Sequence, residues 1–407
     1  MTPITASIPA PAKRFEPLEM GLNLIIQSDV PDDLNKVRQE LFESGSDHNH
    51  LTAELPLING MAIQVDAREL GRFLGVFQDC ERLRVYQDSP ITIPQPIPED
   101  DPGLRLDTGI PSVGADRLWE QGLTGKGVTV AVVDTGIAPH PDVKNRILAF
   151  HDVVNGRTEP YDDNGHGTHV AGIAAGDGAA SEGVWKGAAP DAGLVGIKVL
   201  SASGRGSFSD IIQGIQWAVE NREKYGIRVL SMSLGGRVTR SYRDDPVAQA
   251  VEKAAEAGLV PVVAAGNEGP YIRSVSTPGH ALHAITVGAD DDQATRDPSD
   301  DRVATFSSRG PTRIDDLVKP DVVAPGVKIT SADHTSNGYT SKSGTSMATP
   351  MVAGVVAQLL QARPDATPES IKEALMATAH RLANGDNNTQ GAGLIDAVEA
   401  HRRLTTG

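Results

Sequence analysis

Four short segments carry side chains that could take part in acid–base or nucleophilic chemistry. Asp134 and Asn267 each follow an apolar run, whereas His166 and Ser346 each precede a helical stretch. A carboxylate can orient an imidazole, and an imidazole can take up and return a proton near neutral pH. A serine at a helix N-terminus lies among free backbone amides, and a side-chain amide beside it can complete an oxyanion hole. Together, these side chains would suit nucleophilic attack on a carbonyl group.

Each of these residues also has an ordinary structural interpretation. Asp134 precedes Thr135 and Gly136, a pattern typical of turns, and a serine before a helix commonly caps it. His166 and His169 could form a metal pair, but no glutamate lies between them, as it does in a zinc-protease helix. We therefore interpret His166 as an acid or base and His169 as a buried, hydrogen-bonded structural histidine. The chain order Asp, His, Ser is one of the known orders of a catalytic triad.

The segments that must position these residues alternate between apolar runs and helical stretches from Gly127 onward. Strands are predicted over 128–133, 194–199, 229–232 and 259–264, and helices over 209–220, 246–257 and 391–404. This alternation predicts an α/β domain, a parallel sheet with helices on both faces. Because ligands bind at the carboxyl ends of parallel strands, the residues directly after the apolar runs should lie together.

Residues 20–88 indicate a separate unit with the element order βαββαβ. Strands are expected near 22–26, 51–55, 61–65 and 83–86, with a first helix over 32–42. The second helix opens with Asp66 and is expected to bury four apolar side chains, those of Leu70, Phe73, Leu74 and Phe77. This order is that of a ferredoxin-like α+β sandwich. Five prolines between Ser89 and Gly103 then predict an extended, accessible linker.

We divide the chain into an N-terminal extension (1–15), a small domain (16–88), a linker (89–104) and a large domain (105–407). The 37 Lys and Arg residues against 53 Asp and Glu give a net charge of −16. Such a surface repels nucleic acid and anionic membranes, so neither is expected as a partner. The single cysteine, Cys80, excludes an internal disulfide and is interpreted as a small buried residue.

The sequence shows no targeting or membrane signal. No stretch reaches the roughly 18 apolar residues of a membrane span. Residues 1–15 lack the apolar run of a secretory signal. We therefore expect a cytoplasmic, monomeric protein, with secretion as the alternative.

The motifs around the four candidate residues resemble those of the subtilase family of serine proteases. They read DTGIAPHPDV at 134–143, NGHGTHVAGIAAG at 164–176, SMSLGG at 231–236, AAGNEG at 264–269 and SGTSMATPMVAG at 343–354. The resemblance covers nearly all of 105–407 and implies a subtilisin-like serine endopeptidase preceded by a prodomain. By this resemblance, Asp134, His166 and Ser346 form the triad, and Asn267 is the oxyanion donor.

The resemblance also implies how a protein or peptide substrate binds. Ser233, Leu234 and Gly235 match one of the two edge strands that bind an extended substrate. Residues 203–206, which include Ser203 and Gly204, match the opposite edge. The wall of the pocket for the residue before the scissile bond matches Ala264, Ala265 and Gly266, with its floor near Ser276. Asp142 matches a family calcium ligand, so a structural calcium ion is a hypothesis, whereas no cofactor is expected for the chemistry.

The family's prodomain is a folding aid and inhibitor whose last segment lies in the active-site cleft. The resemblance therefore implies a self-processing zymogen that is cut in the linker. Two alternatives belong to other classes. One is a catalytically silent relative that binds peptides, and the other is a dinucleotide-binding oxidoreductase. The latter requires a GxGxxG sequence after the strand at 128–133, where the chain has DTGIAP instead.

Overall fold

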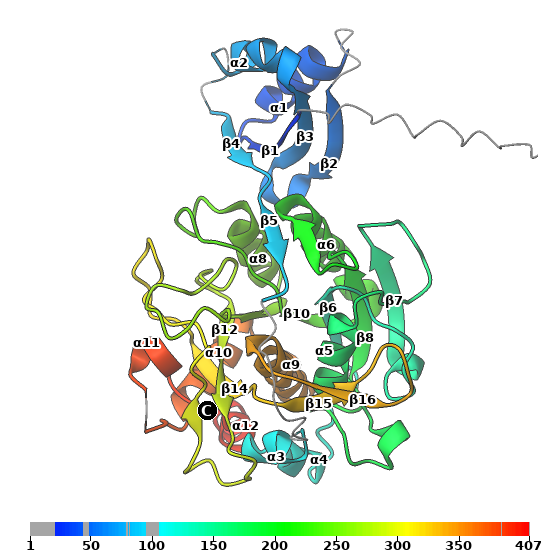
Figure 1. Ribbon diagram of the computed structural model, residues 1–407, viewed down its shortest axis with the longest axis vertical. Coiled ribbons are helices and arrows are strands. Elements are labelled where there is room, and N and C mark those ends of the chain that lie inside the picture. Colours follow the sequence, from blue (N-terminus) through cyan, green and yellow to red (C-terminus); the bar gives the residue numbers. More distant parts are fainter. Residues whose placement is uncertain are drawn as a thin grey trace, which may run out of the picture.

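The protein has a small N-terminal domain that lies at one end of a larger domain (Figure 1). The computed structural model describes residues 21–43, 49–78, 80, 82–94, 106–383 and 385–406. The predicted extension at 1–15 and most of the predicted linker lie outside these ranges.

The small domain is a four-stranded antiparallel sheet covered by two helices. Its strands are β1 (Gly21–Gln27), β2 (His50–Leu55), β3 (Gly60–Asp66) and β4 (Arg84–Gln87), in the order β2-β3-β1-β4. The helices are α1 (Pro31–Arg38), which continues into a wider turn at Gln39–Glu43, and α2 (Leu70–Gln78). This element order and sheet order confirm the ferredoxin-like prediction.

One side chain predicted for the core of the small domain is on its surface. Leu74 is 54% exposed, whereas Phe73 and Val76 are each 4% exposed and pack in the core with Cys80. A three-residue step keeps Phe73 and Val76 on one face of α2, and Leu74 points away from that face. The side chain of Phe77 lies outside the described residues.

The large domain is built on an eight-stranded sheet. The strands are β6 (Thr129–Asp134), β7 (Ile147–Asp152), β8 (Gly193–Lys198), β10 (Ile227–Met232), β11 (Val260–Ala264), β12 (Ile285–Asp291), β13 (Arg302–Val303) and β14 (Val322–Pro325). They run in the order β13-β12-β11-β10-β6-β8-β7, with β14 also beside β12. All pairs are parallel except β12 with β13, which form an antiparallel hairpin.

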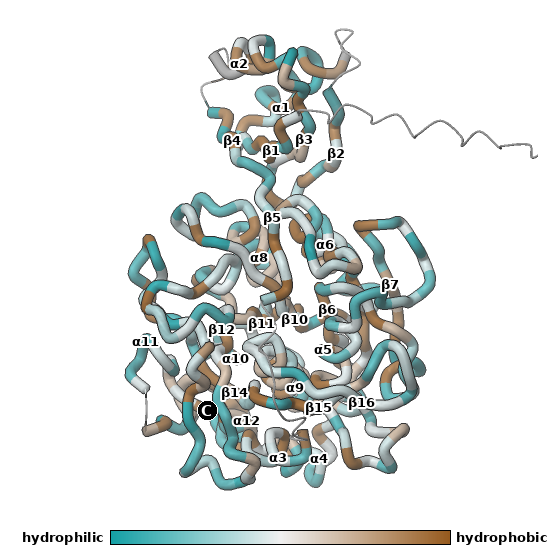
Figure 2. Tube along the Cα trace, viewed as in Figure 1, coloured by the Kyte–Doolittle hydropathy of each residue, from teal (hydrophilic) through white to brown (hydrophobic). Residues whose placement is uncertain are grey.

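Helices cover both faces of this sheet. One face packs against α3 (Leu106–Ser112), α4 (Ala115–Trp119), α5 (His166–Ala175), α9 (Thr345–Ala362), α10 (Pro368–Thr378) and α12 (Ala397–Thr406). The other packs against α6 (Phe208–Glu220) and α8 (Pro246–Glu256). Short helices α7 (Arg222–Tyr225) and α11 (Asn387–Gln390) lie in connections. Hydrophilic residues occupy much of the outer loops (Figure 2).

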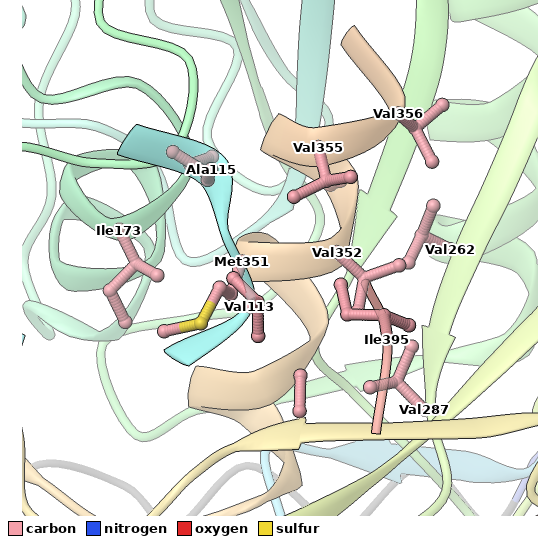
Figure 3. Close-up of a cluster of buried hydrophobic side chains, with 14 of the residues drawn as sticks. Val113, Ala115, Ile173, Val262, Val287, Met351, Val352, Val355, Val356 and Ile395 are labelled. Carbon is pink, nitrogen blue, oxygen red and sulfur yellow. The ribbon is translucent and has the colours of Figure 1, made fainter. Parts of the chain in front are cut away.

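Alternation along the central strand explains the two cores. In β6, Val130 and Val132 belong to the first core, and Ala131 and Val133 belong to the second. Because side chains in a strand point alternately to opposite faces, a strand with apolar residues throughout must be covered twice. Figure 3 shows the first core, where α9 packs on the sheet. The predicted α/β architecture is therefore confirmed.

The last predicted helix begins six residues later than expected, at Ala397. Gly391 has a φ of 61°, and the amide of Ala392 donates to the carbonyl of Asp321 (2.8 Å). The Asp396 carboxylate then accepts the amides of Val398 and Glu399 (2.9 and 3.0 Å), as an N-cap residue does.

Two small strand pairs complete the fold. The first is β15 (Ile329–Ala332) with β16 (Tyr339–Lys342), and the second is β5 (Pro90–Thr92) with β9 (Arg205–Ser207). None of the helices in the described ranges has the length and apolar character needed to cross a membrane.

Candidate active site

Asp134 and His166 form a buried pair where β6 ends and α5 begins. The Nδ1 atom of His166 lies 2.8 Å from Oδ1 of Asp134, which also accepts the amide of Thr135 (2.7 Å). Asp134 is fully buried and His166 nearly so. Because the carboxylate accepts a hydrogen bond from Nδ1, the proton of the neutral ring is on Nδ1 and Nε2 is left as an acceptor.

The turn before α5 is organised by Asp162, which the sequence analysis did not single out. Its Oδ1 accepts hydrogen bonds from Thr135 Oγ1 (2.9 Å) and from the amides of Asn164 and Gly165 (3.0 and 2.8 Å). Its Oδ2 accepts both the amide and the hydroxyl of Thr168 (2.9 and 2.7 Å). This carboxylate therefore joins the end of β6 to the start of α5. An aspartate two residues before an Asn-Gly pair is the sequence signal that could have indicated it.

His169 is a buried structural histidine. Its Nε2 lies 3.0 Å from the carbonyl oxygen of Thr340 in β16. Burial, and after it the neighbouring Lys342 and His166, lowers the pKa of His169 to about 3. The ring is therefore neutral at pH 7 and donates from Nε2, which agrees with its predicted structural role.

Ser346 is the second residue of α9, after Gly344 as N-cap. Backbone amides in the first turn of a helix have no intrahelical acceptor. Pro350, four residues on, has no N–H to donate to the carbonyl of Ser346. The hydroxyl of Ser233 donates to that carbonyl instead (2.9 Å), and Ser346 Oγ lies 3.5 Å from the carbonyl oxygen of Ser233.

The carboxamide of Asn267 is oriented by the start of the same helix. Its Oδ1 accepts hydrogen bonds from the amide and the hydroxyl of Thr345 (3.0 and 2.9 Å). The two donors identify this atom as the oxygen, so the NH₂ group lies on the other side of the carboxamide. A single cavity is lined by His166, Asn267 and Ser346. The structure therefore brings together all four candidate residues, although they come from four separate segments.

A strand of the chain itself lies in the adjoining cleft. Thr92 exchanges two backbone hydrogen bonds with Gly235 (3.0 and 2.9 Å), and the amide of Ile93 donates to the carbonyl of Gly204 (3.0 Å). The same segment, β5, pairs antiparallel with β9. Residues 90–93 thus lie between the two edges predicted to hold an extended substrate. In Figure 1, β5 runs from the small domain into the large one.

This observation corrects one expectation for the linker. Its first part is not accessible, since Ile91 is fully buried. Its prolines are compatible with this pairing because Pro90 is the first residue of β5 and Pro94 lies beyond its end, where no ladder hydrogen bond is lost. Ile93 and Pro94 line the same cavity as His166 and Ser346.

Two other residues predicted for the cleft edges differ from each other in exposure to solvent. Leu234 is fully buried, in one apolar cluster with Ile91 of the cleft segment. Ser203 instead lies with its hydroxyl 3.0 Å from that of Ser201, and its side chain is exposed.

The predicted pocket residues also lie together. The amide and hydroxyl of Ser276 both donate to the carbonyl of Ala265 (3.0 and 3.2 Å), next to the buried Ala264. A Cβ atom added at Gly235 or Gly266 would lie 2.6 or 3.2 Å from the Ser276 hydroxyl oxygen. Glycine at these two positions therefore leaves room for Ser276 between them.

The surroundings of Asp142 do not fit the predicted calcium site. Its two carboxylate oxygens accept hydrogen bonds from the amide of Ala180 and the hydroxyl of Tyr339 (both 2.8 Å). The guanidinium of Arg146 donates to the carbonyl oxygens of Asp142 and Ala175. The carboxylate of Asp142 is thus already hydrogen-bonded to neutral donors. The nearby carbonyl oxygens, which could also bind calcium, are already hydrogen-bonded to the guanidinium of Arg146.

Comparison with known proteins places these residues in a family. The model of the subtilase family matches residues 125–393. Serine protease AprX from Bacillus subtilis is 47% identical over 312 residues, which cover 72% of this chain and 70% of the relative. M-protease from Shouchella clausii is 39% identical over 80% of this chain and 82% of its own length. Subtilisin DY from Bacillus licheniformis is 41% identical over 72% of this chain and 97% of its own length.

Proposed function

Because this chain belongs to the subtilase family and is a serine endopeptidase, we propose that Ser346, His166 and Asp134 are its catalytic residues and that it is made as a self-processing zymogen. The observation that carries the proposal is the strand at 90–92. It lies between the two substrate-binding edges of the same chain and leads to the cavity that contains Ser346.

The geometry supports acyl transfer by the side chains of this chain. Ser346 Oγ attacks the peptide carbonyl, and Nε2 of His166 takes the hydroxyl proton and returns it to the leaving amine. Asp134 holds the Nδ1 proton and stabilises the imidazolium that forms. The amide of Ser346 and the carboxamide of Asn267 donate to the oxyanion. Water then releases the acyl group by the reverse sequence. Subtilases need no cofactor for this catalysis.

Contacts outside the cleft support the small domain as the inhibitor. The Asp88 carboxylate accepts the amide and the hydroxyl of Ser209 (2.9 and 2.7 Å) in the first turn of α6. Gln27 of β1 donates to Gln249 of α8 (2.7 Å). These contacts hold the small domain on α6 and α8, and so they hold the strand at 90–92 in the cleft.

The proposal predicts where the chain is cut. Since Pro94 lies in the cavity with Ser346, the bond that reaches the nucleophile should follow Pro94 and precede Leu106. Purified full-length protein and its Ser346→Ala variant would be incubated separately, and the products analysed by mass spectrometry and N-terminal sequencing. We expect new N-termini between Gln95 and Leu106 from the unaltered protein alone. Equal processing of the variant would contradict self-cleavage, and an N-terminus before Pro94 would contradict the register.

A further inference from the structure

Three buried aspartates lie on one face of the β12–β13 hairpin. Asp290 is opposite Val303 and Asp291 opposite Arg302, so the next pair in this register is Asp292 with Asp301. Because side chains alternate along a strand, Asp290, Asp292 and Asp301 point to the same side. Their exposed fractions are 0, 1 and 2%.

Among the residues that the structure describes, two of these carboxylates have no compensating partner. Neither oxygen of Asp290 or Asp301 has a hydrogen-bond donor in the part of the chain that the structure describes. Asp292, in contrast, accepts the hydroxyl of Thr108 (2.7 Å) and the amide of Ala294 (3.1 Å). An unpaired buried carboxylate is strongly destabilising. Accordingly, burial and the neighbouring carboxylates raise the pKa of both Asp290 and Asp301.

A cation satisfies these groups better than protons do. A proton on each carboxyl group would still leave buried lone pairs without donors, whereas calcium accepts six to eight oxygen ligands from carboxylates, carbonyls and water. In the described ranges, no group of three or more His, Cys, Asp or Glu side chains is placed so that it could hold a metal ion, so at most two carboxylates can be ligands here. Main-chain carbonyls or water must therefore contribute.

We propose that Asp290 and Asp301 bind a calcium ion at this hairpin, with main-chain carbonyls and water as the other ligands. The site differs from the one predicted at Asp142, where donors already use both carboxylate oxygens.

The site is connected to the nucleophile helix and to the start of the large domain. The carbonyl of Asp290 accepts the amide of Gly326 (2.9 Å), whose own carbonyl accepts the amide of Gly344 (2.8 Å), the N-cap of α9. Thr108, which bonds Asp292, lies in α3, the first described helix after the linker. A bound ion would thus stabilise the hairpin, α3 and the position of Ser346 together.

The test measures calcium binding and thermal stability in full-length protein that carries Ser346→Ala, so that self-digestion does not interfere. Titration calorimetry with calcium, after removal of bound metal by a chelator, should show binding at this site and a higher Tm with calcium. In the Asp290→Asn/Asp301→Asn double variant, this binding and the corresponding Tm shift should be lost. The double variant should still fold, because asparagine removes the uncompensated charges.

Two matched controls make the same change of charge elsewhere. Asp297→Asn lies on the exposed part of the same hairpin, and Asp142→Asn lies at the site predicted from the sequence. Both should keep the calcium-dependent Tm shift. The proposal is overturned if calcium does not bind, if the double variant binds it as well as the parent, or if Asp142→Asn abolishes the shift.

Discussion

Ser233 shows how a single hydroxyl can set the position of a nucleophile. Pro350 removes the helical donor for the carbonyl of Ser346, and Ser233 Oγ replaces it from the neighbouring chain segment. Replacing Ser233 by alanine would remove this hydroxyl and leave the backbone edge that binds substrate in place. The replacement should therefore affect the chemical step rather than substrate affinity.

We expect Ser233→Ala to lower kcat about fivefold, because a buried hydrogen bond contributes roughly 1 kcal/mol. KM should change little. Steady-state kinetics on a peptide substrate measures both values. Pro350→Ala supplies a helical N–H for the same carbonyl, so the double variant should recover part of the loss. Full activity of Ser233→Ala alone would show that the hydroxyl does not position Ser346.

At the scale of elements, His169 links α5 to the β15–β16 pair. Its Nε2 lies 3.0 Å from the carbonyl of Thr340 in β16, and Ser331 of β15 donates to the carbonyl of His169 (2.8 Å). The histidine is buried and neutral in the folded protein, whereas in the unfolded chain it can take up a proton freely. Protonation therefore favours the unfolded state.

This contact should make stability depend on pH in a defined range. The pKa of His169 falls from 6.5 to about 3 on folding, so the unfolded state binds more protons between these values. The contribution of neutral His169 to the free energy of unfolding is complete above pH 6.5. It is lost as the pH falls toward 3, by up to about 1.4 kcal/mol per pH unit.

Urea denaturation of the Ser346→Ala protein at several pH values, with and without His169→Gln, tests this dependence. The glutamine variant should show a shallower loss of stability between pH 6.5 and 4. His50→Gln, at an exposed histidine of β2, serves as the matched control. Parallel slopes for the parent and His169→Gln would rule out the proposed titration.

Periodicity predicted the regular elements well and the irregular ones poorly. The strand that ends at Asp134 was found because it is a continuous apolar run, and the helix that starts with Pro246 was found because its apolar residues recur at helix spacing. The β12–β13 hairpin was missed because its long turn is polar and has no apolar pattern. The cleft strand was predicted as accessible linker because its prolines conceal its pairing.

The four candidate residues were identifiable from their motifs, but their supports were not. The Ser233 hydroxyl acts on Ser346, a residue distant in sequence, so no local pattern contains this contact. Asp162 bonds the distant Thr135 as well as its own turn, and only its place before an Asn-Gly pair was a local signal.

At the scale of the whole molecule, Ile91 joins the two domains. It is fully buried, and it belongs to the same apolar cluster as Tyr86 of the small domain and Leu234 of the large one. An aspartate there would place an unpaired charge in this cluster.

Ile91→Asp, made in the Ser346→Ala protein, should release the cleft segment while both domains stay folded. Limited proteolysis should then cut the chain near residues 88–94 at least about tenfold faster than in the parent, since buried charge costs several kcal/mol. Leu22→Asp is a suitable control because Leu22 is 46% exposed in the small domain. Unchanged proteolysis of Ile91→Asp would mean that Ile91 does not hold the segment.

The strand in the cleft is covalently joined to the enzyme that it blocks. Inhibition should therefore be independent of protein concentration before cleavage and should depend on it afterwards. While the chain is intact, the segment competes with substrate at the high effective concentration of a tethered ligand, of the order of millimolar. Once the bond is broken, the same contacts must hold a separate fragment at its bulk concentration. A dilute solution should therefore become active soon after cleavage, whereas a concentrated one should stay inhibited until the fragment is itself degraded.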